Sequence, residues 1–111
     1  MVLSGSSAGA IGAWQWANYL KSKIQSSNPY VLDVIVDSGL FVNNTAYSHD
    51  VYVSDLLAQN QYKLAHVDET YPINECVSKF ASTPYKCVFL EKAFSSIQTR
   101  TLFFNSDYDS E

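Results

Sequence analysis

The feature that most constrains the fold of this chain is a turn rich in glycine and serine near its start. A short apolar run leads into the pentapeptide G-S-S-A-G at residues 5–9, and an apolar-periodic segment follows from Ala10. The pentapeptide fits the pattern G-x-S-x-G, in which a serine stands at the apex of a sharp strand-to-helix turn and its neighbours two positions away must be small. The pattern predicts that Ser7 is an exposed nucleophile, beside a helix N-terminus that favours negative charge.

Two other interpretations compete with this one. G-x-S-x-G is short enough to occur by chance in a loop of glycine and serine. The same segment also resembles a dinucleotide-binding loop, but that loop needs glycines at i, i+2 and i+5, whereas Gly5, Gly9 and Gly12 stand at i, i+4 and i+7. The acidic residue that ends the next apolar run, Asp37, also lies further away than the loop requires. The nucleophile turn is therefore the favoured interpretation.

Length and composition indicate one packed globular domain at most. The chain has 111 residues, of which 47% are hydrophobic and 16% charged. A net charge of −4 without a cluster of lysine and arginine argues against nucleic acid and anionic membranes as partners. No apolar run approaches the length of a membrane span. We expect no cofactor and no metal.

The periodicity of the chain predicts alternating strands and helices. Val31 to Val36 is β-branched and almost continuously apolar, as expected of a strand that is buried on both faces of a parallel sheet. The apolar and polar patterns predict a helix at residues 10–24, a helix at 50–65, a helical turn near 76–80 and a third strand at 99–105. Within the second of these helices, residues 51–53 could instead be extended. The fold class is α/β, a partial parallel sheet of about three strands with flanking helices. Both ends of the chain lie close to a strand, so we expect a fragment of a longer domain.

The cysteines and histidines do not make a metal site. Cys76 and Cys87 supply only two ligands, and His49 and His66 lie far from them in the sequence. Spacing leaves two alternatives open for the cysteines, free buried thiols or a local disulfide in an oxidising compartment. Asn43 opens the sequon N-N-T, which matters only if the chain is secreted.

A nucleophilic serine needs a base and an orienting acid. In α/β-hydrolases these follow in the order serine, acid, histidine. Ser7 follows the first strand, and Asp109 follows the last, with Asp107 as the nearest rival for the acid. The histidine would lie beyond Glu111. Asp37 is better explained as a carboxylate that caps a loop.

Four segments together resemble the pectin acetylesterase and Notum family of secreted carboxylesterases. They are L-S-G-S-S-A-G at 3–9, V-D-S-G-L-F-V-N-N at 36–44, C-V-S-K-F-A-S-T-P-Y-K-C at 76–87 and T-L-F-F-N-S-D-Y-D-S at 101–110. The segments occur in the order of the family and reach both ends of the chain, which makes them more specific than the first segment alone. Residues 45–74 match only loosely.

The resemblance implies roles for individual residues. Ser7 would be the nucleophile, Asp109 the triad acid, and the amide of Ala8 an oxyanion-hole donor. Cys76 and Cys87 would form a disulfide. The family's histidine lies downstream and its other oxyanion donors lie upstream, and neither is in this chain.

The resemblance also implies a secreted protein, which strengthens Asn43 as a glycosylation candidate. Two positions depart from the family. Ala10 stands where a second glycine is common, and Glu111 replaces the Trp-Gln that usually follows Tyr-Asp-Ser.

The expected function is hydrolysis of carboxylic esters by a Ser-His-Asp mechanism, with an acylated carbohydrate or acylated protein as substrate. Residues 1–111 would form a fragment of one α/β-hydrolase domain, from the strand before the nucleophile to the strand before the acid. The alternative is an inactive, truncated relative that acts as a binding protein. Because the histidine is missing, we expect little or no turnover from these residues alone.

Overall fold

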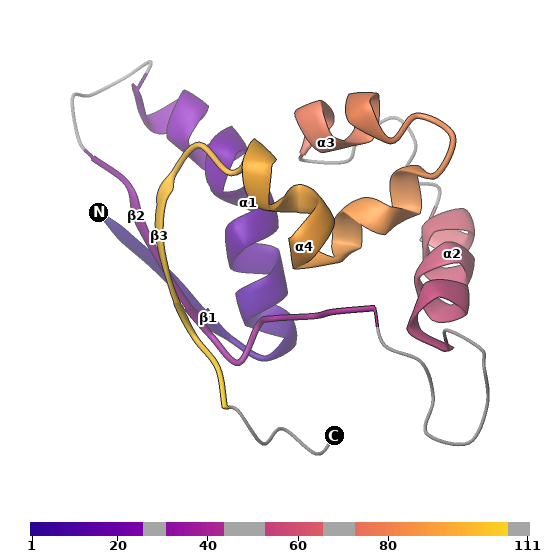
Figure 1. Cartoon of the computed structure of the whole chain (residues 1–111). Helices are drawn as coiled ribbons and strands as arrows, with labels where there is room; N and C mark the ends of the chain where they lie inside the picture. The colour runs from indigo at the N-terminus through magenta and orange to yellow at the C-terminus, as the bar shows by residue number, and fades with distance from the viewer. Residues whose placement is uncertain (26–30, 44–52, 66–72, 107–111) are drawn as a thin grey trace. The chain divides into compact units, whose positions relative to one another are not determined.

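The computed structural model describes residues 1–25, 31–43, 53–65 and 73–106 (Figure 1). The chain divides into two compact units. The first comprises Met1–Leu40 and Ile97–Glu111, and the second comprises Phe41–Ser96. Each unit is described separately below.

The first unit is built on a three-stranded parallel sheet in the order β1-β2-β3. Its strands are β1 (Val2–Ser6), β2 (Asp33–Asp37) and β3 (Arg100–Phe104). The register places the last residues of the strands, Ser6, Asp37 and Phe104, in one row. The carboxyl ends of all three strands therefore meet at one edge of the sheet. The predicted fold class, a partial parallel sheet with flanking helices, is confirmed.

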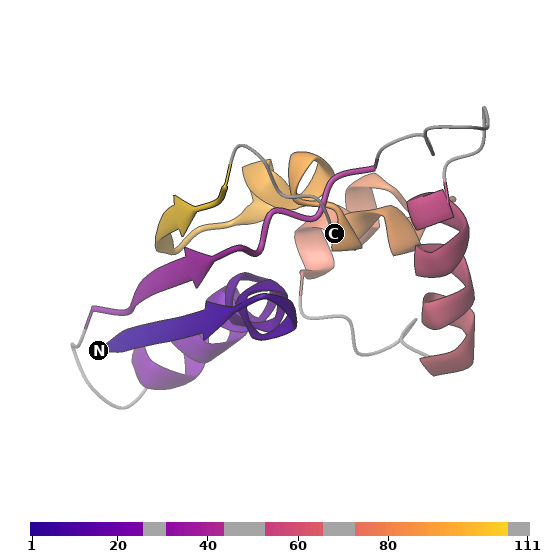
Figure 2. The same cartoon turned by 90° about the horizontal axis from the view of Figure 1, so that it is seen from below.

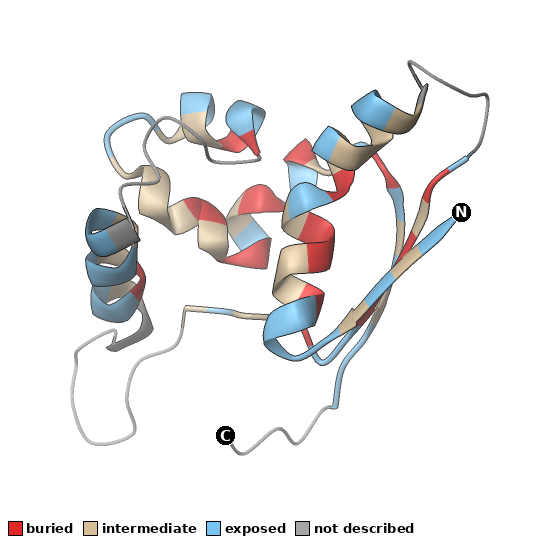
Figure 3. Ribbon diagram, turned by 180° about the vertical axis from the view of Figure 1, so that it is seen from behind, coloured by how far each residue is buried: buried red, intermediate tan, exposed pale blue. Residues whose placement is uncertain are grey.

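Helix α1 (Ala8–Gln25) follows β1 directly and packs against β1 and β2 (Figure 2). Its buried residues recur at helical spacing and are Ala10, Ala13, Trp14 and Ala17. Three of these four are alanines, so the helix can approach the sheet closely, and red marks the side of α1 toward the sheet in Figure 3. Beneath it, Val34 and Val36 of β2 are 1% and 0% exposed. The predicted helix at residues 10–24 is confirmed.

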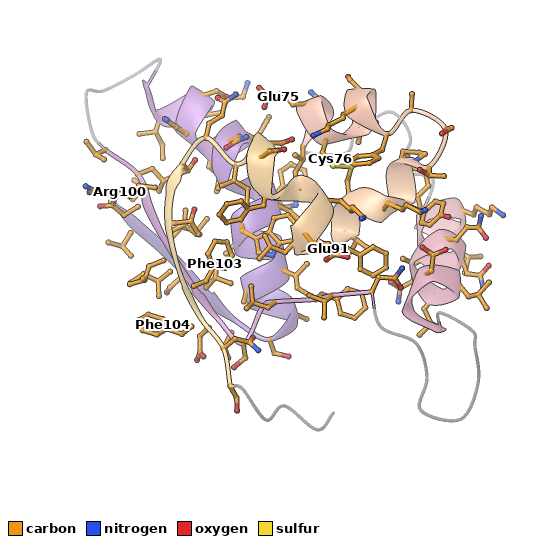
Figure 4. All side chains as sticks on the ribbon, viewed as in Figure 1. Glu75, Cys76, Glu91, Arg100, Phe103 and Phe104 are labelled. Carbon is orange, nitrogen blue, oxygen red and sulfur yellow. A yellow bond between two sulfur atoms is a disulfide. The ribbon has the colours of Figure 1, made fainter. Side chains whose placement is uncertain are left out.

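The opposite face of the sheet is open in the described part of the chain. Val2, Leu102 and Phe104 alternate with the covered residues and are 61%, 54% and 53% exposed. Figure 4 shows Phe103 and Phe104 on opposite sides of β3. The expectation that the second strand is buried on both faces is therefore wrong for this chain. Only the alternate residues of β2 that face α1 are fully buried.

The second unit is helical. It contains α2 (Val53–Ala65), α3 (Asn74–Lys79), the 3-10 helix η2 (Pro84–Val88), α4 (Leu90–Ala93) and the 3-10 helix η3 (Phe94–Ser96). The sequence predicted α2 and the turn of α3, but it gave no signal for the short helices after residue 83. Among the described residues, no helix is long and apolar enough to cross a membrane.

A disulfide between Cys76 of α3 and Cys87 of η2 holds the second unit together. Both cysteines are fully buried, and Figure 4 labels Cys76 on α3. The two cysteines are 11 residues apart in the sequence, and closing a loop of that length stabilises a fold by about 3 kcal/mol. The stacked rings of Phe41 and Phe89, 5.3 Å apart, extend this core. The disulfide that the family resemblance implied is thus present.

Candidate active site

Ser7 occupies the single position between β1 and α1, and its backbone is left-handed. Its φ is 52°, in a region that residues with a Cβ rarely adopt, and its side chain is exposed. The Ser7 N–H donates to the Asp37 carbonyl at 3.0 Å, and the Ser7 carbonyl accepts from the N–H groups of Ala10 and Ile11 at 2.9 and 3.2 Å. Both polar groups of the Ser7 backbone are therefore held. A left-handed serine between a strand and a helix is the geometry of a nucleophile elbow.

Gly5 makes this sharp turn possible. A Cβ at this position would overlap the backbone of Gly9 in the first turn of α1, so no larger residue fits without a shift of the helix. Gly9 itself differs from the expectation that both neighbours must be small. A Cβ on Gly9 would meet nothing within 4 Å outside the backbone of its own helix. Close packing therefore demands glycine only on the strand side of Ser7.

Ala8 is the first residue of α1 and is exposed. The first N–H groups of a helix have no intrahelical acceptor and lie at the positive end of the helix dipole. The first turn of α1 contains no acidic residue that would compensate this positive end. The Ala8 N–H is thus suited to receive a negative oxygen next to Ser7.

A second left-handed serine lies next to the elbow, at the end of β2. Ser38 has a φ of 55°, its N–H donates to the Phe104 carbonyl at 2.8 Å, and its hydroxyl donates to Oδ1 of Asp37 at 3.2 Å. The last contact joins two neighbouring side chains, so the role of Asp37 as a carboxylate that caps the loop stays a prediction. Strained backbone at the ends of two neighbouring strands is common at functional sites.

Gly39 completes this turn and is the tightest position of the segment. A Cβ on Gly39 would lie 2.5 Å from Cβ of Ala10 and 2.6 Å from Cγ1 of Val36. Ala10, which departs from the family pattern, is fully buried and contacts Gly39. The sequence pattern placed Gly39 in a segment that resembles the family but suggested a role only for Asp37, although a glycine close to the end of a buried strand is a signal of close backbone approach.

The third strand carries the chain toward the predicted acid. The Asn105 side chain accepts a hydrogen bond from the Leu40 N–H at 3.4 Å and donates one to the Ser106 carbonyl at 3.2 Å. Asp107 and Asp109 lie outside the described residues, so Asp109 stays a prediction. The parallel register nevertheless has β1 and β3 ending at the same sheet edge, with β2 between them.

The other predicted site residues belong to the second unit or lie outside the described residues. The backbone N–H of Asn43 donates to Oε1 of Glu91 at 3.5 Å, and the remaining two residues of its sequon are outside the described part. Glycosylation of Asn43 stays a prediction. His49 and His66 are also outside the described residues. Where the structure is described, no three His, Cys, Asp or Glu side chains gather into a possible metal site.

In this parallel sheet, strand β1 leads through a left-handed serine directly into helix α1, and this arrangement defines an α/β-hydrolase-like architecture. The family model of pectinacetylesterases matches residues 1–111, and the chain belongs to this family. Among solved structures, two crystal forms of the Wnt deacylase Notum from Drosophila share this fold. They superpose with TM-scores of 0.77 and 0.81 at 22% and 21% sequence identity. The matches cover 93% and 94% of this chain.

This chain spans only 30% of the length of those Notum chains. A comparison with curated protein sequences gives no significant match.

Proposed function

We propose that this chain forms the nucleophile-bearing part of a serine carboxylesterase that removes small O-acyl groups from carbohydrate. The observation that carries the proposal is the exposed, left-handed Ser7 between β1 and α1, with its N–H and carbonyl both hydrogen-bonded. Membership of the pectinacetylesterase family over the whole chain supports the same reaction.

In this mechanism the Ser7 hydroxyl attacks the carbonyl carbon of the ester and passes its proton to a histidine. The Ala8 N–H holds the resulting oxyanion, an interaction that contributes roughly 3 kcal/mol to transition-state stabilisation. Collapse of this intermediate expels the sugar oxygen, which takes the proton from the histidine, and water then hydrolyses the acyl-serine. Asp109 orients the histidine, which the family resemblance places downstream of Glu111.

The proposed substrate is an acetylated pectin-like polysaccharide outside the cell. The family description names pectin acetyl esters, and the family model covers the chain from end to end. The buried Cys76–Cys87 disulfide favours an oxidising compartment, in which Asn43 is available for glycosylation. Acylated protein is the second substrate class, because the fold is shared with a Wnt deacylase.

The test uses the protein encoded by the complete gene that contains this chain. We expect it to release acetate from acetylated pectin and to react with a fluorophosphonate at Ser7. Ser7→Ala should lower acetate release at least about 10³-fold, as loss of a nucleophile does. Ser6→Ala is the matched control, because Ser6 is an exposed serine next to Ser7, at the end of β1, and should be dispensable. Acetate release that survives Ser7→Ala would refute the proposal. Residues 1–111 alone should show little or no turnover.

A binding role without catalysis is the second candidate function. The open face of the sheet favours it, since exposed apolar residues in a cluster mark interaction surfaces. In that case the complete gene product would not hydrolyse esters and would not react with a fluorophosphonate.

A further inference from the structure

We infer that Gly39 is a positioning residue for the Ser7 nucleophile and that it acts through Ala10. The inference rests on the proposed function, because it concerns the serine that carries the proposed reaction. Its basis is the tight packing of the Asp37–Gly39 turn against the first turn of α1.

The contact between Gly39 and Ala10 leaves no room for a side chain. A Cβ on Gly39 would lie 2.5 Å from Cβ of Ala10, 3.2 Å from the Ala10 carbonyl carbon and 2.6 Å from Cγ1 of Val36. Real Cβ atoms essentially never approach other atoms below 3.0 Å. Ala10 and Val36 are both 0% exposed, so neither can move toward solvent to relieve the overlap. A side chain at position 39 must therefore displace the helix or the turn.

The same Ala10 holds the backbone of Ser7. Its N–H donates to the Ser7 carbonyl at 2.9 Å. On the other side, the Ser7 N–H donates to the carbonyl of Asp37, two residues before Gly39, at 3.0 Å. The Ser7 N–H is thus held by Asp37, which belongs to the Asp37–Gly39 turn, and the Ser7 carbonyl by Ala10, which packs against Gly39. Because Ser7 is left-handed and exposed, these two hydrogen bonds hold its backbone and so set the direction in which its Cα–Cβ bond leaves the turn.

The turn is hydrogen-bonded to β3 on one side and to Trp14 of α1 on the other, which limits how much of the displacement it can absorb. The Ser38 N–H donates to the Phe104 carbonyl of β3 at 2.8 Å, and Nε1 of Trp14 donates to the Gly39 carbonyl at 3.4 Å. Trp14 is 1% exposed. A Cβ at position 39 will therefore push on Ala10 and shift the start of α1. A shift of this kind misplaces the Ser7 hydroxyl and the Ala8 N–H together.

The experiment compares Gly39→Ala with Gly12→Ala in the complete gene product. Gly12 lies in α1, two residues after Ala10. A Cβ on Gly12 would meet nothing within 4 Å outside the backbone of its own helix, so the control adds the same atom without a clash. Active sites are counted by fluorophosphonate titration, and kcat is expressed per titrated site so that misfolded protein is not counted. Hydrogen exchange of the backbone amides of residues 7–11 is measured in parallel.

We expect Gly39→Ala to lower kcat per titrated site about a hundredfold, as a misplacement near 1 Å does. KM should change less than about twofold, because substrate binding groups are not moved. Gly12→Ala should stay within about twofold of the wild type. Adding Ala10→Gly to Gly39→Ala removes the closest overlap and should recover about tenfold in kcat.

Other results would overturn the inference. It fails if kcat per titrated site is unchanged in Gly39→Ala, if Gly12→Ala loses as much, or if Ala10→Gly gives no recovery. Should Gly39→Ala not fold, Ala10→Ser adds one atom to the same contact, and a kcat per site equal to the wild type would overturn it as well.

Failure of the proposed function is recognised separately. If acetate release survives Ser7→Ala, the esterase mechanism is wrong, and the exchange measurement then decides the positioning role alone. Faster exchange in residues 7–11 of Gly39→Ala, but not of Gly12→Ala, would sustain the coupling of Gly39 to the elbow. Equal exchange in both variants would refute it.

Discussion

At the scale of single residues, the left-handed backbone of Ser7 makes a prediction about stability. A residue with a Cβ pays roughly 1–2 kcal/mol in this conformation, and glycine does not. We therefore expect Ser7→Gly to be more stable than Ser7→Ala by about 1 kcal/mol, measured as the difference in free energy of unfolding in urea. Ser22, exposed within α1, is the control, because there glycine should be less stable than alanine by about 1 kcal/mol. If the stability difference between the glycine and alanine variants had the same sign at positions 7 and 22, the backbone of Ser7 would not be strained.

The two glycines that flank Ser7 should respond differently to alanine. Gly5→Ala should lower the free energy of unfolding by about 2–3 kcal/mol, because its Cβ overlaps the Gly9 backbone. Gly9→Ala should be neutral or stabilising by up to about 1 kcal/mol, since its Cβ meets open space and alanine favours the helix. Urea midpoints of the two variants provide the measurement. Equal losses in the free energy of unfolding for Gly5→Ala and Gly9→Ala would contradict the packing described above for the first turn of α1.

At the scale of elements, the pairing of β2 with β3 is reinforced by an exposed ion pair that depends on pH. Arg100 Nε lies 2.6 Å from Oδ1 of Asp33, and this hydrogen bond lowers the pKa of Asp33 from its usual 3.8. A lowered pKa in the folded state means that the contribution to stability is complete above pH 3.8 and is lost as the pH falls through the folded pKa. Because the Arg100 side chain is 77% exposed and that of Asp33 is 34% exposed, the contribution is small and decreases with added salt.

The variant Asp33→Asn tests this dependence. It should be slightly less stable than the wild type at pH 7, and the difference should shrink below pH 3.8. Urea midpoints across pH 2 to 7 provide the measurement, with Arg100→Gln as the companion variant. A difference that stays constant with pH would assign the effect to a cause other than this ion pair.

The elements that could be predicted from the sequence are those that carry a strong local pattern. Helix α1 was predictable because Ala10, Ala13, Trp14 and Ala17 repeat at helical spacing, and β2 because its run is β-branched. The short helices from Pro84 to Ser96 were not, because three to five residues are too few to show a period. Their positions follow from burial and from the disulfide at Cys87, which are tertiary properties.

The candidate site was predictable only in part for a similar reason. The spacing of G-x-S-x-G predicted Ser7 as the candidate nucleophile. The proposed role of Gly39 depends instead on its contact with Ala10, which is far away in the sequence. No local pattern reports that contact. The pattern also does not reveal which side of the turn is crowded, because the room for a Cβ at Gly9 and its absence at Gly5 depend on how the strand and the helix pack.

At the scale of the whole molecule, one face of the sheet is open in the part of the chain that the structure describes. Parallel sheets in α/β proteins are normally covered on both faces, and α1 covers only one face here. The chain has 30% of the length of the Notum chains that share its fold. Leu102 and Phe104 on the open face are exposed although their apolar character suits a core.

This open face should make residues 1–111 self-associate when they are expressed alone. Leu102→Ser should weaken the association at least about tenfold, because burying a leucine contributes about 1.5–3 kcal/mol and 1.4 kcal/mol is a factor of ten. Leu64→Ser is the matched control, since Leu64 of α2 is 81% exposed but does not belong to the sheet. Sedimentation equilibrium of the three proteins gives the association constants. Equal weakening by both variants would show that association is not directed by the sheet, and a monomeric wild type would show that the exposed face does not need a cover.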